Sequence, residues 1–289
     1  MNDAMKKTSV SYKTKAKLLM IPGLVGFALF YLVPLFWSLY YALIDNNFKQ
    51  TFVGLRHFEN LFANEFFVRA LVNTLCFSAV SVVLIIAFSL VISVMFLYAG
   101  KRTRFLRSLF LLPMLLPTAA VAFLWRNLFN ASGALTAVSL ADTSLWAIVF
   151  SWQAMPLYII FLWKYSGFII ILLSGAILSV EKEIYQAAAL DGAGGFRLHR
   201  YITLPMIRPT LFFSCVLTAV NGFSIYKEVY YLFGGDYPPD AVYLLQHFMN
   251  NHFRRLNYPV LSASAWMFVV ILLAAVFVFY RLDNKKSLS

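Results

Sequence analysis

Polar and charged residues interrupt an apolar run between residues 221 and 230, at spacings that can place several of them on one side of a helix. Asn221 and Ser224 are three residues apart, and Lys227 or Glu228 follows at the next helical interval. Such a stripe can line a path through a membrane, and the same residue types can equally bond neighbouring helices, at about 0.5–2 kcal/mol each. The candidate path residues are Asn221, Ser224, Tyr226, Lys227, Glu228 and Tyr230.

An unpaired charge within an apolar stretch is costly unless it faces a cavity or a partner, and the candidates for such a role are Lys164, Lys227 and Glu228. For Lys227 and Glu228 we favour a place at the outer end of a span, where long side chains reach the headgroups, over direct contact with a ligand. Lys164 lies between Trp163 and Tyr165. Its alternatives are a ligand contact and a pair with a residue of a neighbouring span.

Catalytic and metal-binding patterns are missing from the sequence. No acidic pair, nucleophile elbow or neighbouring Cys/His couple is present, and the histidines have no metal-ligand spacing. Both cysteines, Cys76 and Cys215, lie in apolar runs, which argues against a disulfide framework or a zinc site. Phosphate-binding glycine loops are also absent. We therefore expect no catalytic residue, no metal site and no cofactor bound by this chain.

The composition is that of an all-α protein with several membrane spans. Of 289 residues, 61% are hydrophobic and 12% are charged, whereas a soluble domain has roughly 25% charged residues. The charged residues are gathered in short stretches between long uncharged ones. The net charge of +12 therefore indicates orientation in a membrane, and we expect no nucleic-acid partner.

Six spanning helices are predicted, because a span needs about 20 mostly apolar residues. The region 145–180 fits either one long kinked element or two short spans, and the distribution of charge selects one. The run that follows the basic segment 1–17 is too long for a signal peptide and is expected to be retained. The predicted spans are 18–43, 72–98, 106–128, 145–175, 205–226 and 262–281.

Basic residues fix the predicted orientation. The N-terminal segment, the loop 99–107, the segment 181–208 and the C-terminal tail carry 16 of the 24 Lys and Arg. If short basic segments face the cytoplasm, both termini, including the tail 282–289, are cytoplasmic. The connections 44–71, 129–144 and 227–261 then face outward.

The cytoplasmic stretch 181–205 predicts two short helices. Residues 183–190 favour one helix, Asp191 and Gly192 supply a turn, and residues 196–201 begin a second helix before Pro205 opens the next span. Such a pair can form a knob that fits the groove of another protein. An amphipathic loop resting on the lipid headgroups is an equally good physical interpretation.

This stretch resembles the signature of the permease subunits of binding-protein-dependent ABC importers, which is Glu-Ala-Ala, a Gly after three residues, and Ile-x-Leu-Pro after nine more. Gln186 stands where the family has an acidic residue, so a contact with a cation of the ATPase would be weaker here. Ser179 and Val180 replace the usual Ile-Pro. The resemblance assigns coupling to the ATPase to Gln186, Ala187, Ala188, Asp191, Gly192, Ile202, Leu204 and Pro205.

Other segments resemble the carbohydrate-transporting branch of the same family. They are the runs 110–129, 163–168 and 223–235, the last followed by an aromatic-rich outward stretch. A sugar site needs donors and acceptors for hydroxyl groups and aromatic faces for the ring. The resemblance therefore implies that the polar and aromatic residues of the fifth span contact a sugar.

The resemblance also implies an assembly. It consists of a type I importer permease fold in the cell membrane, a second similar permease forming a heterodimer, two cytoplasmic ATPases that bind ATP and Mg²⁺, and an extracytoplasmic solute-binding protein that delivers a mono- or oligosaccharide or related polyol. The chain itself would not be an enzyme. The alternative is an ion-coupled secondary transporter or channel, which predicts inverted repeats and acidic relays that the sequence lacks. A membrane-embedded enzyme would need clustered titratable residues.

Overall fold

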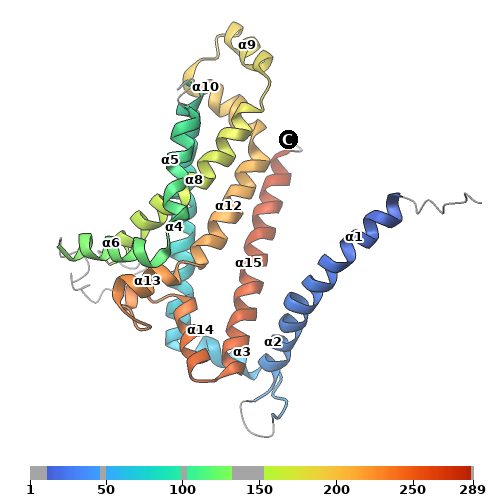
Figure 1. The fold of residues 1–289 in the computed structure, drawn as a ribbon, viewed down its shortest axis with the longest axis vertical. Helices are drawn as coiled ribbons and strands as arrows, with labels where there is room; N and C mark the ends of the chain where they lie inside the picture. The colour runs from blue at the N-terminus through green and yellow to red at the C-terminus, as the bar shows by residue number, and fades with distance from the viewer. Residues whose placement is uncertain (1–11, 46–49, 99–102, 132–152, 288–289) are drawn as a thin grey trace, which may run out of the picture.

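The computed structural model describes residues 12–45, 50–98, 103–131 and 153–287, and in these ranges the chain is helical (Figure 1). The only β pairing among them is an isolated bridge between Ile44 and Phe52. Five helices are long and apolar enough to cross a membrane, and a sixth span results if a bent pair of helices is counted as one. The predicted all-α membrane fold is confirmed.

Helix α8 (Met155–Leu178) is the centre of the bundle. It packs against α4 (Glu65–Tyr98), α5 (Thr103–Leu115) and α12 (Arg208–Phe223). In its most apolar window 61% of the residues are buried, the largest share among the candidate spans. Burial on several sides explains why this helix is apolar around its whole circumference.

Serine hydroxyls join α4 to α8. Ser89 Oγ donates to the carbonyl of Ser166 at 3.3 Å, and one turn later Ser93 Oγ donates to the carbonyl of Ile170 at 3.1 Å. All four residues are buried. Such small hydroxyl residues allow close approach and bond neighbouring helices in an apolar medium.

The contact between α5 and α8 depends on a glycine. A Cβ atom at Gly167 would lie 1.8 Å from the carbonyl oxygen of Phe110. That separation is far inside van der Waals contact, so any side chain at position 167 would force the two backbones apart.

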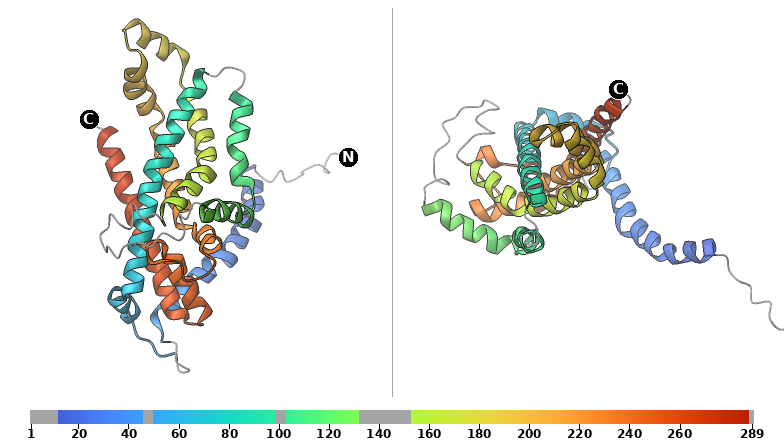
Figure 2. Two further views of the ribbon diagram at one scale, coloured as in Figure 1. Left: turned by 90° about the vertical axis from the view of Figure 1, so that its left-hand side faces the viewer. Right: turned by 90° about the horizontal axis from the view of Figure 1, so that it is seen from above.

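The first apolar segment leans away from the bundle (Figures 1 and 2). It consists of α1 (Tyr12–Phe27), a π turn (Ala28–Leu32) and α2 (Val33–Leu43). Only α2 packs closely, against α15 (Tyr258–Ser287), where Trp266 Nε1 donates to Ser38 Oγ at 3.0 Å. The π turn ends just before Pro34, whose missing N–H and bulky ring disturb the α-helical ladder.

The predicted third span, 106–128, is broken. Helix α5 ends at Leu115, and α6 (Thr118–Ala131) leaves at 91° to it. Pro117 lies at the break, where it cannot donate a helical hydrogen bond. The sequence predicted the apolar run but not this change of direction.

The predicted fifth span, 205–226, is also divided. A short π turn (His199–Thr203) and α11 (Leu204–Met206) precede α12, which ends at Phe223. After Ser224 and Ile225 the chain continues as α13 (Tyr226–Phe233), which packs against α6. The helices that follow the two interruptions, α6 and α13, are therefore neighbours (Figure 1).

The remaining predicted spans differ from the observed helices at their ends. Helix α4 starts seven residues before the predicted 72, and α15 covers the predicted 262–281 with extensions on both sides. Residues 1–11 of the predicted basic segment and 145–152 of the predicted fourth span lie outside the described residues.

The short helices lie at opposite ends of the bundle. Helices α9 (Lys182–Leu190) and α10 (Gly195–Leu198) are at the end toward which α15 finishes, and α3 (Arg56–Ala63) and α14 (Leu245–Arg254) are at the other (Figure 1). A short 3-10 helix (Asp240–Val242) precedes α14. The short helices of the basic segment 181–208 and those of the connections 44–71 and 227–261 thus lie at opposite ends of the bundle (Figure 1).

Candidate functional site

The two predicted short helices of segment 181–205 are present as α9 and α10, and they extend beyond the long helices (Figure 1). Gln186 and Ala187 are exposed, whereas Ala188 is buried against the chain. Large apolar side chains are also exposed on this segment: Leu190 is 90%, Phe196 77% and Tyr201 71% accessible. This apolar surface is suited to contact with another protein or with lipid.

Gly192 ends α9 in a left-handed conformation with φ +76°. The N–H of Gly192 donates to the carbonyl of Ala189, and the N–H of Ala193 donates to that of Ala188. These are the two hydrogen bonds of a Schellman cap, which requires the positive φ that glycine adopts at no steric cost. A Cβ at position 192 would meet no atom within 4 Å. Backbone geometry rather than crowding therefore selects glycine here.

Thr203 joins the two halves of the segment, and the sequence did not identify it. Its side chain is buried, and its Oγ1 lies 3.2 Å from both the Tyr185 hydroxyl and His199 Nδ1. Thr203 is the unspecified residue of the Ile-x-Leu-Pro group, so the motif gave no signal for it. A hydroxyl that both donates and accepts can bond two partners at once.

The end of the motif is a turn into α12. The N–H of Leu204 donates to the carbonyl of His199 across a π turn, and Pro205 follows with no N–H of its own. Ile202 and Leu204 are partly buried, and Pro205 and Asp191 are exposed. The motif therefore supplies both an outer surface and the anchor of that surface on the bundle.

The predicted polar stripe of the fifth span is interrupted by a turn between α12 and α13. The chain turns at Ser224, whose N–H donates to the carbonyl of Asn221, so Asn221 and Glu228 belong to different helices. Ser224 is exposed and lines a cavity of about 170 Å³ together with Thr74 and Gln246. Asn221 is partly buried.

The two predicted tyrosines lie in a polar cluster that the chain completes by itself. Tyr226 donates its hydroxyl proton to Asp236 Oδ1 at 3.1 Å and accepts from Asn250 Nδ2 at 2.9 Å. Asp236 also forms an ion pair with Arg254. The ring of Tyr230 lies 5.9 Å from that of Tyr226. Here the polar groups fix α13 against α14.

Lys227 and Glu228 have different environments. Lys227 is exposed, whereas the Glu228 side chain is 2% exposed and forms an ion pair with Lys164 Nζ at 2.5 Å. The interpretation of Glu228 as a residue that reaches the headgroups is therefore wrong. The alternative for Lys164, a pair with a neighbouring segment, is correct. Lys164 Nζ also donates to Thr118 Oγ1 at 2.9 Å.

The outward histidine His247 is buried in α14. The backbone N–H of Leu244 donates to its Nδ1 at 3.1 Å, and burial lowers the pKa of His247 to about 4. It is therefore neutral at physiological pH. Among the described residues, no group of three or more His, Cys, Asp or Glu side chains is placed to hold a metal ion.

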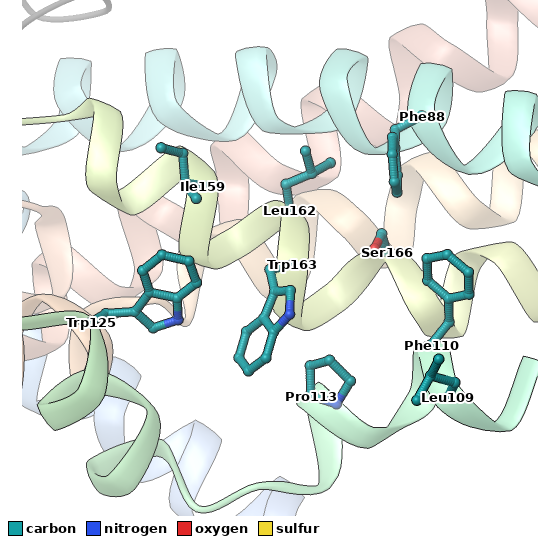
Figure 3. A pocket seen from close by; sticks show the side chains of 9 residues that line it. All are labelled: Phe88, Leu109, Phe110, Pro113, Trp125, Ile159, Leu162, Trp163 and Ser166. Atoms are coloured by element: carbon teal, nitrogen blue, oxygen red, sulfur yellow. The ribbon is translucent and has the colours of Figure 1, made fainter. Parts of the chain in front are cut away.

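A cavity of about 360 Å³ lies in the angle between α5, α6 and α8 (Figure 3). Trp125 of α6 and Trp163 of α8 face this space, and the indole N–H of Trp125 has no hydrogen-bond partner among the described residues. The other lining residues are mostly apolar: Phe88, Leu109, Phe110, Pro113, Ile159, Leu162 and Ser166.

Known proteins match the chain over most of its length. The YurN protein of Bacillus subtilis, named a probable ABC transporter permease, is 29% identical, with 89% of this chain and 91% of the relative covered. The sn-glycerol-3-phosphate transport system permease UgpA of Yersinia pestis is 30% identical over 90% of this chain and 89% of its own. A chain of a bacterial ABC transporter that imports alginate has the same fold, with a TM-score of 0.74, 22% identity, and coverage of 93% and 95%.

The family profile matches residues 85–285, a range that runs from the middle of α4 to the end of α15 and includes α9, α10 and the buried Lys164–Glu228 pair. The chain therefore belongs to the family described as the binding-protein-dependent transport system inner membrane component.

Proposed function

We propose that this permease imports a sugar, either a mono- or oligosaccharide or a related polyol, through a path that it forms with a second similar permease. The proposal is supported by the transport of sn-glycerol-3-phosphate by one relative and of alginate by the structural neighbour, as their names state. The aromatic rings and amide and hydroxyl groups between α12 and α14 are of the type that binds carbohydrate.

The observation that carries the proposal is the exposed surface of α9 and α10. Leu190 and Phe196 are largely exposed at the tip of a segment that is rigidly capped at Gly192 and bonded at Thr203. A rigid apolar knob is suited to a protein groove, because little conformational freedom is lost when it binds. In this proposal two separate ATPase subunits, which bind ATP and Mg²⁺, dock on this surface from the cytoplasm.

In this proposal α3 and α14 lie on the outer side of the cell membrane, at the end of the bundle opposite α9 and α10 (Figure 1). There, in this proposal, they meet an extracytoplasmic solute-binding protein. A second crystal structure of an alginate transporter, which has the same fold, holds a periplasmic protein loaded with an alginate pentasaccharide. The chain then supplies the path and the coupling segment, and hydrolysis of ATP takes place entirely in its partners.

The experiment is uptake by proteoliposomes that contain the assembled transporter. Sugar uptake should require enclosed ATP, the ATPase subunits and the binding protein, and a panel of labelled sugars and polyols identifies the substrate. Collapse of the ion gradients should leave the rate unchanged. Uptake that persists without the ATPases and stops when the gradients collapse would overturn the proposal and favour an ion-coupled transporter.

The ion-coupled alternative has weaker structural support. It requires a chain of acidic groups across the membrane, whereas Glu228 is the only buried acidic residue among those described, and it is paired with Lys164.

A further inference from the structure

A buried charge pair and a hydroxyl group join helices α6, α8 and α13. Lys164 of α8 lies with its Nζ 2.5 Å from Glu228 Oε1 of α13 and 2.9 Å from Thr118 Oγ1 of α6. The side chains of Lys164 and Glu228 are 7% and 2% exposed. Lys164 Nζ also lies 5.3 Å from the centre of the Tyr165 ring, so the ammonium group is surrounded by favourable partners.

The partners of Lys164 lie at the starts of the two helices that follow interruptions, α6 and α13. Thr118 is the first residue of α6, directly after the 91° bend at Pro117. Glu228 is the third residue of α13, directly after the break that ends α12. Lys164 itself lies in the unbroken α8, at the centre of the bundle. A single ammonium group therefore bonds both α6 and α13 to one unbroken helix.

Packing alone does not explain why this pair is charged. Apolar residues of similar volume stabilise a buried site as well as an ion pair does, or better, because an ion pair loses its hydration. Unlike apolar side chains, two buried charges are stable only while they remain in contact, because no water is present to replace a lost partner. The pair thus favours one relative position of α6 and α13, and it opposes intermediate positions.

Helix segments on either side of a break can move relative to each other with little loss of backbone hydrogen bonds, because those bonds are already interrupted at the break. Irregular backbone at membrane depth occurs where it is covered by protein or lines a cavity, and half-helices around such breaks are typical of transport paths. Here α6 and α13 pack on each other, and the cavity of about 360 Å³ lies beside α6. Any opening between them must separate Glu228 or Thr118 from Lys164.

We propose that Lys164 and Glu228 are positioning residues of the translocation path, which hold α6 and α13 in the arrangement described here until the binding protein docks. This inference rests on the proposed function as an importer. Loss of the pair removes a stabilising contact from the arrangement described here but not from the alternative one. The alternative arrangement therefore becomes populated even in the absence of the binding protein. ATP hydrolysis then no longer depends on the binding protein.

The test uses the assembled transporter with a double substitution, Lys164→Met with Glu228→Leu. It removes both charges at similar volume, so no unpaired charge is left to prevent folding. The measured quantity is the ratio of ATPase activity with and without the binding protein. We expect this ratio to fall about tenfold, and Lys164→Glu with Glu228→Lys to recover part of it. The matched control is Tyr231→Phe, on the same helix as Glu228 but exposed, which should keep the ratio of the unaltered chain. An unchanged ratio in the double apolar variant would overturn the inference.

A distance measurement tests the positioning role of the pair independently of the transported substrate. Spin labels at Phe123→Cys of α6 and Tyr231→Cys of α13, both exposed positions, report the separation of the two segments in a background with Cys76→Ser and Cys215→Ser. We expect a single narrow distribution in the chain with the charge pair and a broadened or second distribution in the double apolar variant. Superimposable distributions would contradict the positioning role, whether or not the protein proves to be a sugar importer.

Discussion

The segment 181–205, which we propose couples the chain to the ATPase and call the coupling segment, differs from the buried Lys164–Glu228 pair in which of its groups are exposed and which are buried. In the coupling segment, large apolar side chains such as Leu190 and Phe196 face outward while internal hydrogen bonds hold the backbone. At the Lys164–Glu228 pair, the polar groups are buried and satisfy one another. Exposed apolar surface indicates a partner outside the chain, whereas a closed polar set indicates a constraint within it.

This difference also explains which region the sequence predicted correctly. The coupling segment depends on local features, namely a short helix, a glycine with positive φ and a proline at a fixed interval, and all of these are legible in sequence. The Lys164–Glu228 pair joins residues 64 positions apart, and no local pattern specifies it. Glu228 and Lys227 are neighbours of opposite charge, and only the packing of α13 decides which of them is buried.

The largest expected effect lies in the buried region, three residues from Lys164. Gly167→Val should prevent stable packing of α5 on α8, because a Cβ there would lie 1.8 Å from a backbone oxygen of Phe110. We expect a loss of at least about 3 kcal/mol, measured as a large drop in the thermal unfolding temperature in detergent. Gly175→Val is the control on the same helix, since its Cβ would meet no atom within 4 Å. Equal stability of the two variants would refute the close-packing account.

In the coupling segment, a bulky residue at Gly192 should act on binding rather than on insertion. Gly192→Val forces a β-branched residue to φ +76°, at a cost of about 1–2 kcal/mol or a change in the cap of α9. We expect about tenfold or greater loss of ATPase subunits that co-purify, with normal amounts of permease in the membrane. Gly194→Val is the control, because Gly194 has an extended backbone. Unchanged co-purification of Gly192→Val would count against the docking surface.

Removal of the Thr203 hydroxyl gives an intermediate effect. Thr203→Val keeps the shape of the side chain but leaves Tyr185 and His199 without their shared partner, for a cost of about 1 kcal/mol. We expect a several-fold weaker affinity of the permease for the ATPase subunits, measured by titration in detergent. Tyr185→Phe with Thr203→Val should be no worse than Thr203→Val alone, and fully additive losses would show that the two residues act separately.

The smallest effect is expected at the exposed end of α9. Gln186→Glu introduces the acidic residue that the family has at this position, and surface ion pairs contribute about 0.2–1 kcal/mol. Affinity for the ATPase should therefore rise by about two- to threefold at low salt and lose this gain at high salt. Gln186→Ala serves as the matched neutral control. A gain that does not depend on salt would mean that charge is not its cause.

The spans show where prediction from sequence ends. Runs of apolar residues predicted six spans, because burial in lipid imposes one composition on all of them. The two breaks were not predicted. Pro117 interrupts the third span, yet Pro113 lies within α5 and Pro22 within α1 without ending either helix. A proline leaves the carbonyl four residues earlier without its helical hydrogen bond. Whether the span then bends or breaks depends on which neighbouring groups can donate to that carbonyl, and those neighbours are set by the fold.

The central proposal is that the exposed surface of α9 is a docking site for the ATPase subunits. The most direct test is labelling of Ala187→Cys, in a chain with Cys76→Ser and Cys215→Ser, by a membrane-impermeant maleimide in inside-out vesicles. Ala187 is exposed, so rapid labelling is predicted without the ATPase subunits and protection is predicted once they are added. Equal labelling with and without bound ATPase subunits would contradict the account.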